Sequence, residues 1–317
     1  MTDLSKIQDT TIDGYPVSKA LRQLQMLELD VLKELLRVCE KHHLRIFADS
    51  GTLLGAVRHR GFIPWDDDID MAMPRPDYDR LAQIASTEFK HPFFYQTTMT
   101  DPLHVRGHAQ LRHSLSTAVL ELEYDLNINQ GVFIDIFPLD GVPDDEAQQE
   151  KDKAETKRLL NVMRMNRPFQ LPVTWNPMKM WHYWKERRQA LAWLKQNGMT
   201  NKDCFKRFED ILRSNNYETS ARVGTLAFWY RRFKDHSIYD GKVMMQFEDI
   251  EIPAPIEYDK LLRIFFGDNY MTPIHEAAAH TGLIFDPMRP YTEVQAELRR
   301  AHSWWKDFWK EIKKRVG

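Results

Sequence analysis

Residues 65–73 carry the pattern that decides the fold, and they read Trp65-Asp66-Asp67-Asp68-Ile69-Asp70-Met71-Ala72-Met73. Successive side chains of a β-strand point to opposite faces, so a strand here would place Asp66, Asp68 and Asp70 together and the apolar side chains opposite them. Asp67 would lie on the opposite face. A helix would instead set Asp68 and Asp70 about 200° apart around its axis, where they could not bind one ion. The alternation therefore predicts a strand with one packed and one charged face.

Three carboxylates on one face repel one another unless a proton or a cation neutralises them. Oxygen ligands favour magnesium, manganese or calcium over zinc. An EF-hand loop is excluded, because counting from Asp66 puts Met71 where that loop needs Gly and Asp77 where it needs Glu. A second predicted strand, residues 132–137, is apolar on both faces except at Asp135, and an unpaired buried charge there would cost several kcal/mol. We therefore predict that Asp68, Asp70 and Asp135 converge on one divalent metal ion.

The sequence on either side of residues 65–73 predicts a mixture of helices and strands. Apolar residues recur at three- and four-residue steps over 18–43, which indicates a long amphipathic helix. A short strand over 44–48, a turn at Ser50-Gly51-Thr52 and a helix through 53–57 follow, and another helix is expected over 77–89. Towards the C-terminus we expect a hairpin around 242–252 and helices over 258–266 and 292–314.

These elements predict an α+β fold with a mixed sheet flanked by helices. We expect a catalytic core over residues 1–145, an inserted, aromatic-rich helical subdomain over 146–235, and a C-terminal part over 236–317 that completes the catalytic domain. The 44 basic and 46 acidic residues give a net charge of -2, which argues against a nucleic-acid partner. The two cysteines lack the spacing of a zinc site, and neither GxGxxG nor GxxxxGK[ST] occurs.

The turn Ser50-Gly51-Thr52 before a short helix, the Asp-x-Asp strand and a third Asp on a later strand together resemble the nucleotidyltransferase fold. More narrowly, three segments resemble the LicD family of phosphocholine transferases. They are GTLLGAVRHRGFIPWDDDIDMAMPRPDYDRL (51–81), NQGVFIDIFPLDGVP (129–143) and YDKLLRIFFGDNYMTP (258–273). The resemblance implies a nucleotidyltransferase-like core in which Asp68, Asp70 and Asp135 are the catalytic metal ligands, with Mg²⁺ as the cofactor and Mn²⁺ as the alternative. It also implies transfer of a phospho-alcohol, with phosphocholine favoured, from a CDP-linked donor such as CDP-choline to a hydroxyl of a glycan, releasing CMP. Lipopolysaccharide and teichoic acid are the glycans expected.

Several residues near the acidic stretch are candidates for binding the donor. Ser50, Gly51 and Thr52 open a helix whose N-terminal N–H groups are suited to a phosphate, although a simple N-cap explains them as well. Arg58, His59 and Arg60 form a basic stretch that we expect to reach the donor diphosphate, with a solvated loop as the alternative. Trp65 is expected to pack on the donor or in the core. Arg75 and Arg112 are weaker candidates, and a position on the surface is expected for both. Asp135 is also a candidate for accepting the proton of the acceptor hydroxyl.

Two alternatives remain open at the level of the sequence. A nucleotidyltransferase that attaches a nucleoside monophosphate and releases pyrophosphate would use the same metal geometry. The amphipathic C-terminal helix, rich in lysine, is expected to pack on the body of the protein, with contact to an anionic membrane that carries a lipid-linked acceptor as the alternative. Without an apolar N-terminal segment, the chain is expected in the cytoplasm or at the inner face of the membrane.

Overall fold

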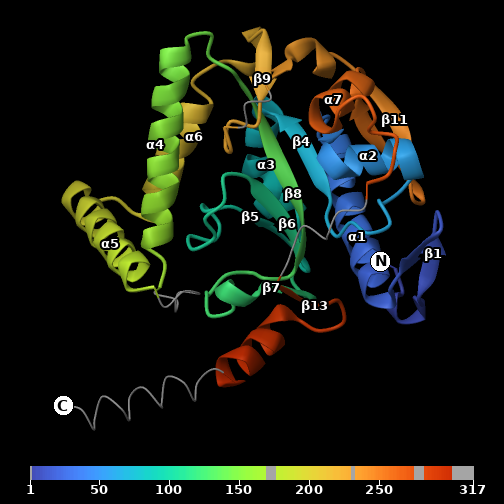
Figure 1. Ribbon diagram of the computed structural model, residues 1–317, viewed down its shortest axis with the longest axis horizontal. Coiled ribbons are helices and arrows are strands. Elements are labelled where there is room, and N and C mark those ends of the chain that lie inside the picture. Colours follow the sequence, from blue (N-terminus) through green and yellow to red (C-terminus); the bar gives the residue numbers. More distant parts are fainter. Residues whose placement is uncertain (1, 169–175, 230–232, 275–281, 302–317) are drawn as a thin grey trace.

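The computed structural model describes residues 2–168, 176–229, 233–274 and 282–301. Within them, seven strands form a central mixed sheet in the order β10-β9-β8-β4-β3, with β6 and then β5 branching from β8 (Figure 1). These strands are β3 (Phe47–Ala48), β4 (Asp70–Pro74), β5 (Phe93–Gln96), β6 (Ala109–His113), β8 (Val132–Gly141), β9 (Arg222–Gly224) and β10 (Lys234–Asp235). The α+β class predicted from the sequence is confirmed.

The long strand β8 is the centre of this sheet, because it pairs with three others. It runs parallel to β4, with Asp135 opposite Asp70, and antiparallel to β6, with Asp135 opposite Gln110. Its far end pairs with β9. Asp135 is therefore flanked by one polar residue on each neighbouring strand.

The predicted strand over residues 65–73 is shorter in the structure and begins only at Asp70. Residues 64 and 65 form a turn, in which the N–H of Asp66 donates to the carbonyl of Ile63 at 2.9 Å. Residues 66–69 are irregular because their backbone bonds elsewhere: the carbonyl of Asp66 accepts from Gln25 Nε2 at 3.0 Å. The strict alternation expected for residues 66–69 therefore does not apply.

Most of the predicted helices form close to their expected bounds. The helices are α1 (Lys19–Lys41), α2 (Ser50–His59), α3 (Arg75–Glu88), α4 (Glu146–Met165), α5 (Pro177–Asn197), α6 (Asn201–Leu212) and α7 (Tyr258–Phe266). Ser18 caps α1 by accepting from the N–H of Leu21, and a capping box of Thr200 and Asp203 begins α6. The helix α1 packs on β6 and β8, and α3 packs on β4, β5 and β8.

Three smaller two-stranded sheets lie outside the central one. They are β1 (Thr10–Ile12) with β2 (Tyr15–Val17), β11 (Lys242–Phe247) with β12 (Ile250–Pro255), and β7 (Thr117–Leu120) with β13 (Leu283–Asp286). The predicted hairpin is β11–β12. The C-terminal helix is present over 291–301, and its predicted remainder, 302–314, lies outside the described residues. No helix of the described part is long and apolar enough to span a membrane.

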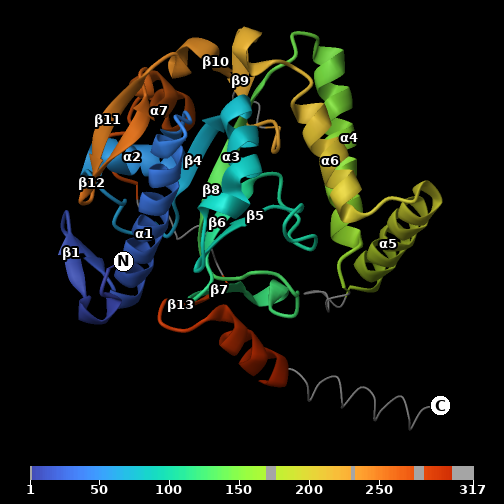
Figure 2. The same cartoon turned by 180° about the vertical axis from the view of Figure 1, so that it is seen from behind.

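The helices α4, α5 and α6 lie together on one side of the central sheet, and α2, α7 and β11 lie on the other (Figures 1 and 2). The helical part of the predicted insertion ends at Leu212. The strands β9 and β10, which follow it, belong to the central sheet.

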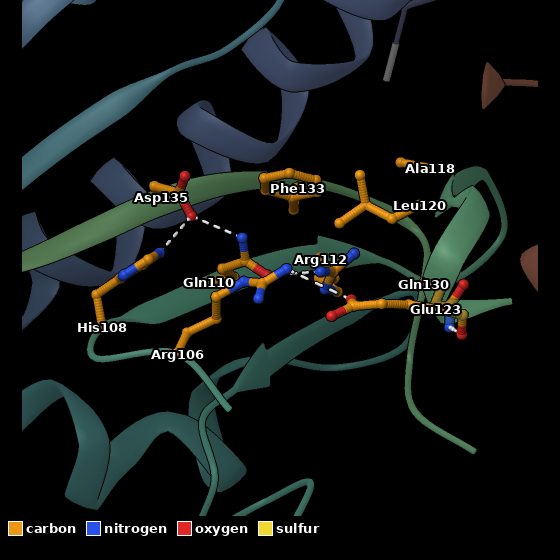
Figure 3. Close-up of a pocket in the computed structure, with 10 residues that line it drawn as sticks. All are labelled: Arg106, His108, Gln110, Arg112, Ala118, Leu120, Glu123, Gln130, Phe133 and Asp135. Atoms are coloured by element: carbon orange, nitrogen blue, oxygen red, sulfur yellow. Dashed lines mark hydrogen bonds and ion pairs between the residues drawn. The ribbon is translucent and has the colours of Figure 1, made fainter. Parts of the chain in front are cut away.

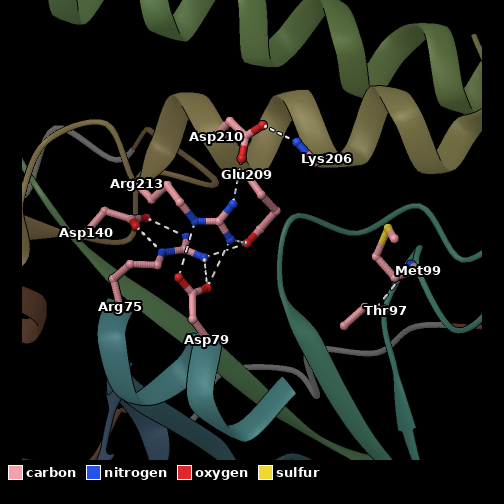
Figure 4. A network of polar contacts seen from close by, with 9 residues as sticks. All are labelled: Arg75, Asp79, Thr97, Met99, Asp140, Lys206, Glu209, Asp210 and Arg213. Atoms are coloured by element: carbon pink, nitrogen blue, oxygen red, sulfur yellow. Dashed lines mark hydrogen bonds and ion pairs between the residues drawn. The ribbon is translucent and has the colours of Figure 1, made fainter. Parts of the chain in front are cut away.

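A buried ion network ties α6 to this sheet (Figure 4). Arg75 at the start of α3 donates to both carboxylate oxygens of Asp140, at 2.5 and 3.1 Å, and to Glu209 of α6 at 2.6 Å. Arg75 is 4% exposed and Asp140 is fully buried, so the expectation that Arg75 lies on the surface was wrong. Burial raises the pKa of Asp140 to about 6 even though Arg75 opposes this. The network fixes the position where β8 leaves the core.

Candidate functional site

Two of the three predicted metal ligands lie side by side in the sheet. Asp70 and Asp135 are register partners on parallel strands, so their side chains leave the same face. Burial, followed by the charges of Asp68 and Asp135, raises the pKa of Asp70 well above its usual range. The predicted approach of residues more than sixty positions apart in the sequence is thus present in the fold.

The acidic segment before β4 forms a tighter group than the sequence suggested. Asp66, Asp67 and Asp68 each offer a carboxylate oxygen, and these oxygens lie within 4.8 Å of one another. This trio shares only Asp68 with the predicted triad. The expectation that Asp67 points away from its neighbours was wrong, because residues 66–69 are not extended and their side chains do not alternate.

Two further buried carboxylates face this group and were not predicted from the sequence. Glu28 of α1 is 3% exposed, and burial followed by Asp68, Asp67, Asp66 and Asp135 raises its pKa well above the usual range. Asp49 is 4% exposed, precedes α2, and donates its N–H to the carbonyl of Asp70 at 3.0 Å. Neither Glu28 Oε2 nor Asp49 Oδ1 has a hydrogen-bond partner among the described residues. We call these seven carboxylates, Glu28, Asp49, Asp66, Asp67, Asp68, Asp70 and Asp135, the carboxylate cluster.

The carboxylate of Asp135 is held in place from the neighbouring strand (Figure 3). Its Oδ1 accepts from Gln110 Nε2 at 2.7 Å and lies 3.0 Å from His108 Nε2. Within the described part of the chain His108 Nδ1 has no partner, which favours the tautomer that carries its hydrogen on Nε2. The His108 ring packs against Phe137 and Phe228, which also contact each other. Hydrogen bonds of this kind orient a carboxylate that binds a metal.

The predicted turn at Ser50-Gly51-Thr52 opens α2 and contacts the cluster directly. The Thr52 hydroxyl accepts from the N–H of Asp70 at 2.8 Å, which joins the start of α2 to the start of β4. A Cβ at Gly51 would lie 2.7 Å from Asp66 Oδ2, so a larger residue would displace that carboxylate. The N-terminus of α2, with its positive end of the helix dipole, therefore lies against the cluster.

The predicted basic stretch forms the end of α2 and contacts the turn between β1 and β2 and the segment that follows α7. Arg58 donates from Nη1 to the carbonyl of Tyr270 at 3.0 Å and from Nε to His59 at 2.9 Å. The other ring nitrogen of His59 lies 2.5 Å from Asp13, and Arg60 ends the helix in a left-handed conformation. Arg58 and His59 therefore belong to the last turn of α2, and Arg60 caps it, whereas the alternative had been a solvated loop.

Trp65 lies next to the N-terminal hairpin. Its ring contacts Tyr15, with the two centroids 4.4 Å apart, and it is partly buried against the main core. This packing corresponds to the core alternative for Trp65.

A cavity of about 200 Å³ adjoins Asp135 on the side of β6 (Figure 3). Arg106, Arg112 and Glu123 contribute its charged lining besides Asp135. Arg112 is 5% exposed, so the expectation of a surface position was wrong here too. The strand β6 carries Arg112 and Gln110, and all five of its residues are buried although three of them, Gln110, Arg112 and His113, are polar.

The cluster fits a divalent cation by the chemistry of its donors. The groups offered are carboxylate oxygens, which suit hard ions such as Mg²⁺ or Mn²⁺. The unpartnered oxygens of Glu28 and Asp49, both buried, fit a bound cation, because a cation would reduce the repulsion among seven carboxylates in one region.

Comparison with known proteins places the site in a family domain. Residues 43–159 match the family described as LicD/FKTN/FKRP, nucleotidyltransferase domain. The lipopolysaccharide cholinephosphotransferase LicD of Haemophilus influenzae is 34% identical over 129 residues, which cover 39% of this chain and 46% of that protein. Uncharacterized proteins of Rickettsia prowazekii and Rickettsia typhi are 38% and 36% identical over 80 residues, which cover 25% of this chain and 28% and 24% of those proteins.

The alignments thus span less than half of the length of these relatives. The chain carries a LicD-family domain over residues 43–159, which confirms the resemblance predicted from the segments at 51–81 and 129–143. That domain holds every residue of the carboxylate cluster except Glu28, which precedes it on α1.

Sequence reasoning missed Glu28, Asp49, His108 and Gln110. For Glu28 a signal was present, since it follows Leu24 by four residues and precedes Val31 by three, and therefore lies on the apolar stripe of α1. For His108 and Gln110 no local signal exists, because their role depends on β6 pairing with β8.

Proposed function

We propose that this protein is a metal-dependent transferase that moves a phospho-alcohol from a CDP-activated donor to a hydroxyl of a glycan and releases CMP. Phosphocholine is the favoured group and CDP-choline the favoured donor, because the Haemophilus relative is a lipopolysaccharide cholinephosphotransferase. The observation that carries the proposal is the pairing of Asp70 with Asp135 on parallel strands, beside Asp68, inside a LicD-family domain.

In this proposal Asp68, Asp70 and Asp135 hold Mg²⁺, or Mn²⁺ in its place. The ion would neutralise charge on the transferred phosphoryl group and on the leaving oxygen. Gln110 and His108 keep the Asp135 carboxylate oriented, and Thr52 fixes the backbone of Asp70. These two contacts on one oxygen hold the Asp135 carboxylate in a fixed orientation, which supports its proposed role as a metal ligand.

The same geometry supports one second candidate, a nucleotidyltransferase that attaches a nucleoside monophosphate and releases pyrophosphate. The description of the matched domain as a nucleotidyltransferase domain favours it. The released product separates the two reactions, since phospho-alcohol transfer from a CDP-alcohol yields CMP.

The test is to incubate the full chain with Mg²⁺ and CDP-choline, CDP-ethanolamine, CDP-glycerol or CDP-ribitol, with and without lipopolysaccharide or teichoic acid. We expect CMP release with one of these donors, loss of activity in a chelator and recovery with Mn²⁺. Pyrophosphate release from a nucleoside triphosphate, without CMP release from any CDP-alcohol, would favour the second candidate.

Single Asp→Asn changes connect the reaction to the cluster. We expect Asp68→Asn, Asp70→Asn and Asp135→Asn to abolish transfer without unfolding the protein, because each keeps its size and loses a charged ligand. Asp144→Asn is the matched control, since Asp144 lies exposed before α4. Full activity in Asp135→Asn would remove Asp135 from the metal site.

The acceptor glycan is proposed to be linked to a lipid at the inner face of the membrane, where a cytoplasmic enzyme would meet it. The predicted contact involves the C-terminal helix over 292–314, of which residues 302–314 lie outside the described part. Co-sedimentation with anionic vesicles at low salt tests this contact, and recovery of the protein in the supernatant would exclude it.

A further inference from the structure

The cavity beside Asp135 carries an excess of positive charge away from the carboxylate cluster. Arg106 and Arg112 line it, and Arg167 contacts Glu123, another residue of the lining. Glu123 is the carboxylate at this end of the cavity, and it contacts Arg106 at 3.4 Å and Arg167 at 2.8 Å. One carboxylate thus contacts two of the three guanidinium groups.

Arg112 is held rigidly and has no carboxylate within ion-pair distance among the described residues. Its three nitrogens donate to neutral oxygens: Gln96 Oε1, the carbonyl of Gly131 at 2.7 Å, and Gln110 Oε1 at 2.5 Å. Its guanidinium also lies 4.6 Å from the centre of the Phe133 ring. Because each Nη of arginine carries two N–H groups, one on each remains to be used.

A buried guanidinium without a carboxylate contact is costly unless an anion joins it. Burial and then the charge of Arg106 lower the pKa of Arg112, as expected where positive charge is in excess. The same electrostatics disfavour a quaternary ammonium group in this cavity, in spite of the aromatic ring of Phe133. The volume of about 200 Å³ would hold roughly six waters at about 30 Å³ each, enough for a phosphoryl group and a few attached atoms.

One oxygen in the lining has no hydrogen-bond partner among the described residues. Gln130 is 2% exposed and donates from Nε2 to the carbonyl of Glu123 at 2.6 Å, while its Oε1 has no partner in the described part of the chain. An amide oxygen accepts a hydrogen bond from a hydroxyl. The cavity therefore combines donors for an anion with an acceptor for a neighbouring hydroxyl.

We propose that this cavity is a phosphate subsite, in which Arg106 and Arg112 bind a phosphoryl anion of the substrate, and that the donor diphosphate supplies it. The second part rests on the proposed function, because it needs a CDP-linked donor. Gln110 connects the subsite to the cluster: its amide accepts from Arg112 and donates to Asp135. A phosphoryl group here would lie next to a metal held by Asp135.

The test is calorimetric binding of inorganic pyrophosphate to the full chain in a chelating buffer, which removes the metal from both partners. We expect Arg106→Gln to weaken binding at least tenfold, which corresponds to about 1.4 kcal/mol. Arg106 is the residue of choice because it is partly exposed, so its replacement leaves the buried bonds of Arg112 intact. The matched control is Arg158→Gln, which removes an arginine paired with Glu155 on α4, outside the cavity.

A second variant is expected to change pyrophosphate binding in the opposite direction. Glu123→Gln removes the negative charge at this end of the cavity and should tighten pyrophosphate binding several-fold. Unchanged binding in Arg106→Gln, or weaker binding in Glu123→Gln at unchanged thermal stability, would overturn the phosphate subsite. Choline binding that depends on Glu123 would overturn it as well, since the cavity would then select a cation.

Parallel titrations with CDP-choline and with glucose 6-phosphate identify the source of the anion. Weaker binding of CDP-choline to Arg106→Gln supports the donor, whereas an effect confined to the sugar phosphate supports a phosphorylated acceptor and overturns the donor assignment. These measurements require no turnover. An absence of CMP release with every donor would therefore refute the proposed function and leave the phosphate subsite to be judged by binding.

Discussion

Replacing Asp70 with Asn tests the carboxylate cluster through the stability of the metal-free protein. Asp70 and Asp135 are register partners, and neighbouring strands lie about 4.8 Å apart. Two unit charges about 5 Å apart repel by about 3 kcal/mol at an effective dielectric constant of about 20. Asn keeps the size of the side chain and removes this repulsion. The value is an upper bound, because the raised pKa of Asp70 means that a bound proton relieves part of the repulsion in the wild type.

The expected change in melting temperature follows from the size of the chain. Unfolding entropy is about 2.1 cal/mol/K per residue, or about 0.7 kcal/mol/K for 317 residues. A gain of about 3 kcal/mol then raises Tm by about 4 °C in a chelator. With Mg²⁺ at about 100 times its Kd, the wild type gains about 2.7 kcal/mol, whereas a variant without one ligand gains much less. The difference between the two proteins should therefore shrink or reverse as Mg²⁺ is added.

Thermal melts monitored by circular dichroism, in chelator and along a Mg²⁺ titration, measure how the difference in Tm between the two proteins changes. Asp144→Asn is the control, and it should stay within about 0.5 kcal/mol of the wild type under both conditions. An Asp70→Asn protein that melts below the wild type in chelator would refute the repulsion argument. An equal gain from Mg²⁺ in both proteins would show that Asp70 does not bind the ion.

Three further changes test other parts of the structure. Arg58→Ala should lower kcat/KM for the donor about tenfold or more, or about 1 to 3 kcal/mol, if its guanidinium contacts the diphosphate; unchanged steady-state kinetics in a folded variant would leave it a structural residue. Burial and neighbouring carboxylates raise the pKa of Glu28, so its protonated form stabilises the metal-free protein at low pH and this contribution is lost as pH rises above about 4.5. Glu28→Gln should flatten that slope in thermal melts, and equal slopes would contradict the assignment. Arg75→Ala should lower the free energy of unfolding by about 3 to 5 kcal/mol in urea, because Asp140 and Glu209 stay buried without it; a loss under about 1 kcal/mol would contradict this.

The parts of the site that lie on apolar elements could be predicted from the sequence. The approach of Asp135 to Asp70 was predicted because Asp135 is the single charge in a strand that is otherwise apolar, and burial of such a charge needs a partner. The helix α1 was found from its apolar stripe. Asp67 was misplaced, because a proline and a turn at residues 64 and 65 interrupt the extended backbone that its alternation assumed. The pattern of residue types predicted a strand over residues 65–73, but the turn at residues 64 and 65 leaves residues 66–69 irregular.

The strand β6 was not predicted, because three of its five buried residues are polar. A segment that reads AQLRH becomes a buried strand only where distant groups satisfy its side chains: Gln96 and Gly131 accept from Arg112, and Asp135 accepts from Gln110. Each of these partners lies at least 16 residues from the β6 residue that it contacts, so the local sequence around β6 does not indicate them.

The two electrostatic halves of the site depend on a single strand pairing. Because β8 places Asp135 between Asp70 of β4 and Gln110 of β6, the negative cluster and the positive cavity meet at one residue. The proposed phosphoryl transfer would use both halves, since the carboxylates would hold a metal that neutralises the transferred oxygens, and the guanidinium groups would hold the remainder of an anionic donor. A shift of β6 by one residue would turn Gln110 and Arg112 to the opposite face of the sheet. The register of β6 on β8 is therefore as important to the proposed reaction as the aspartates themselves.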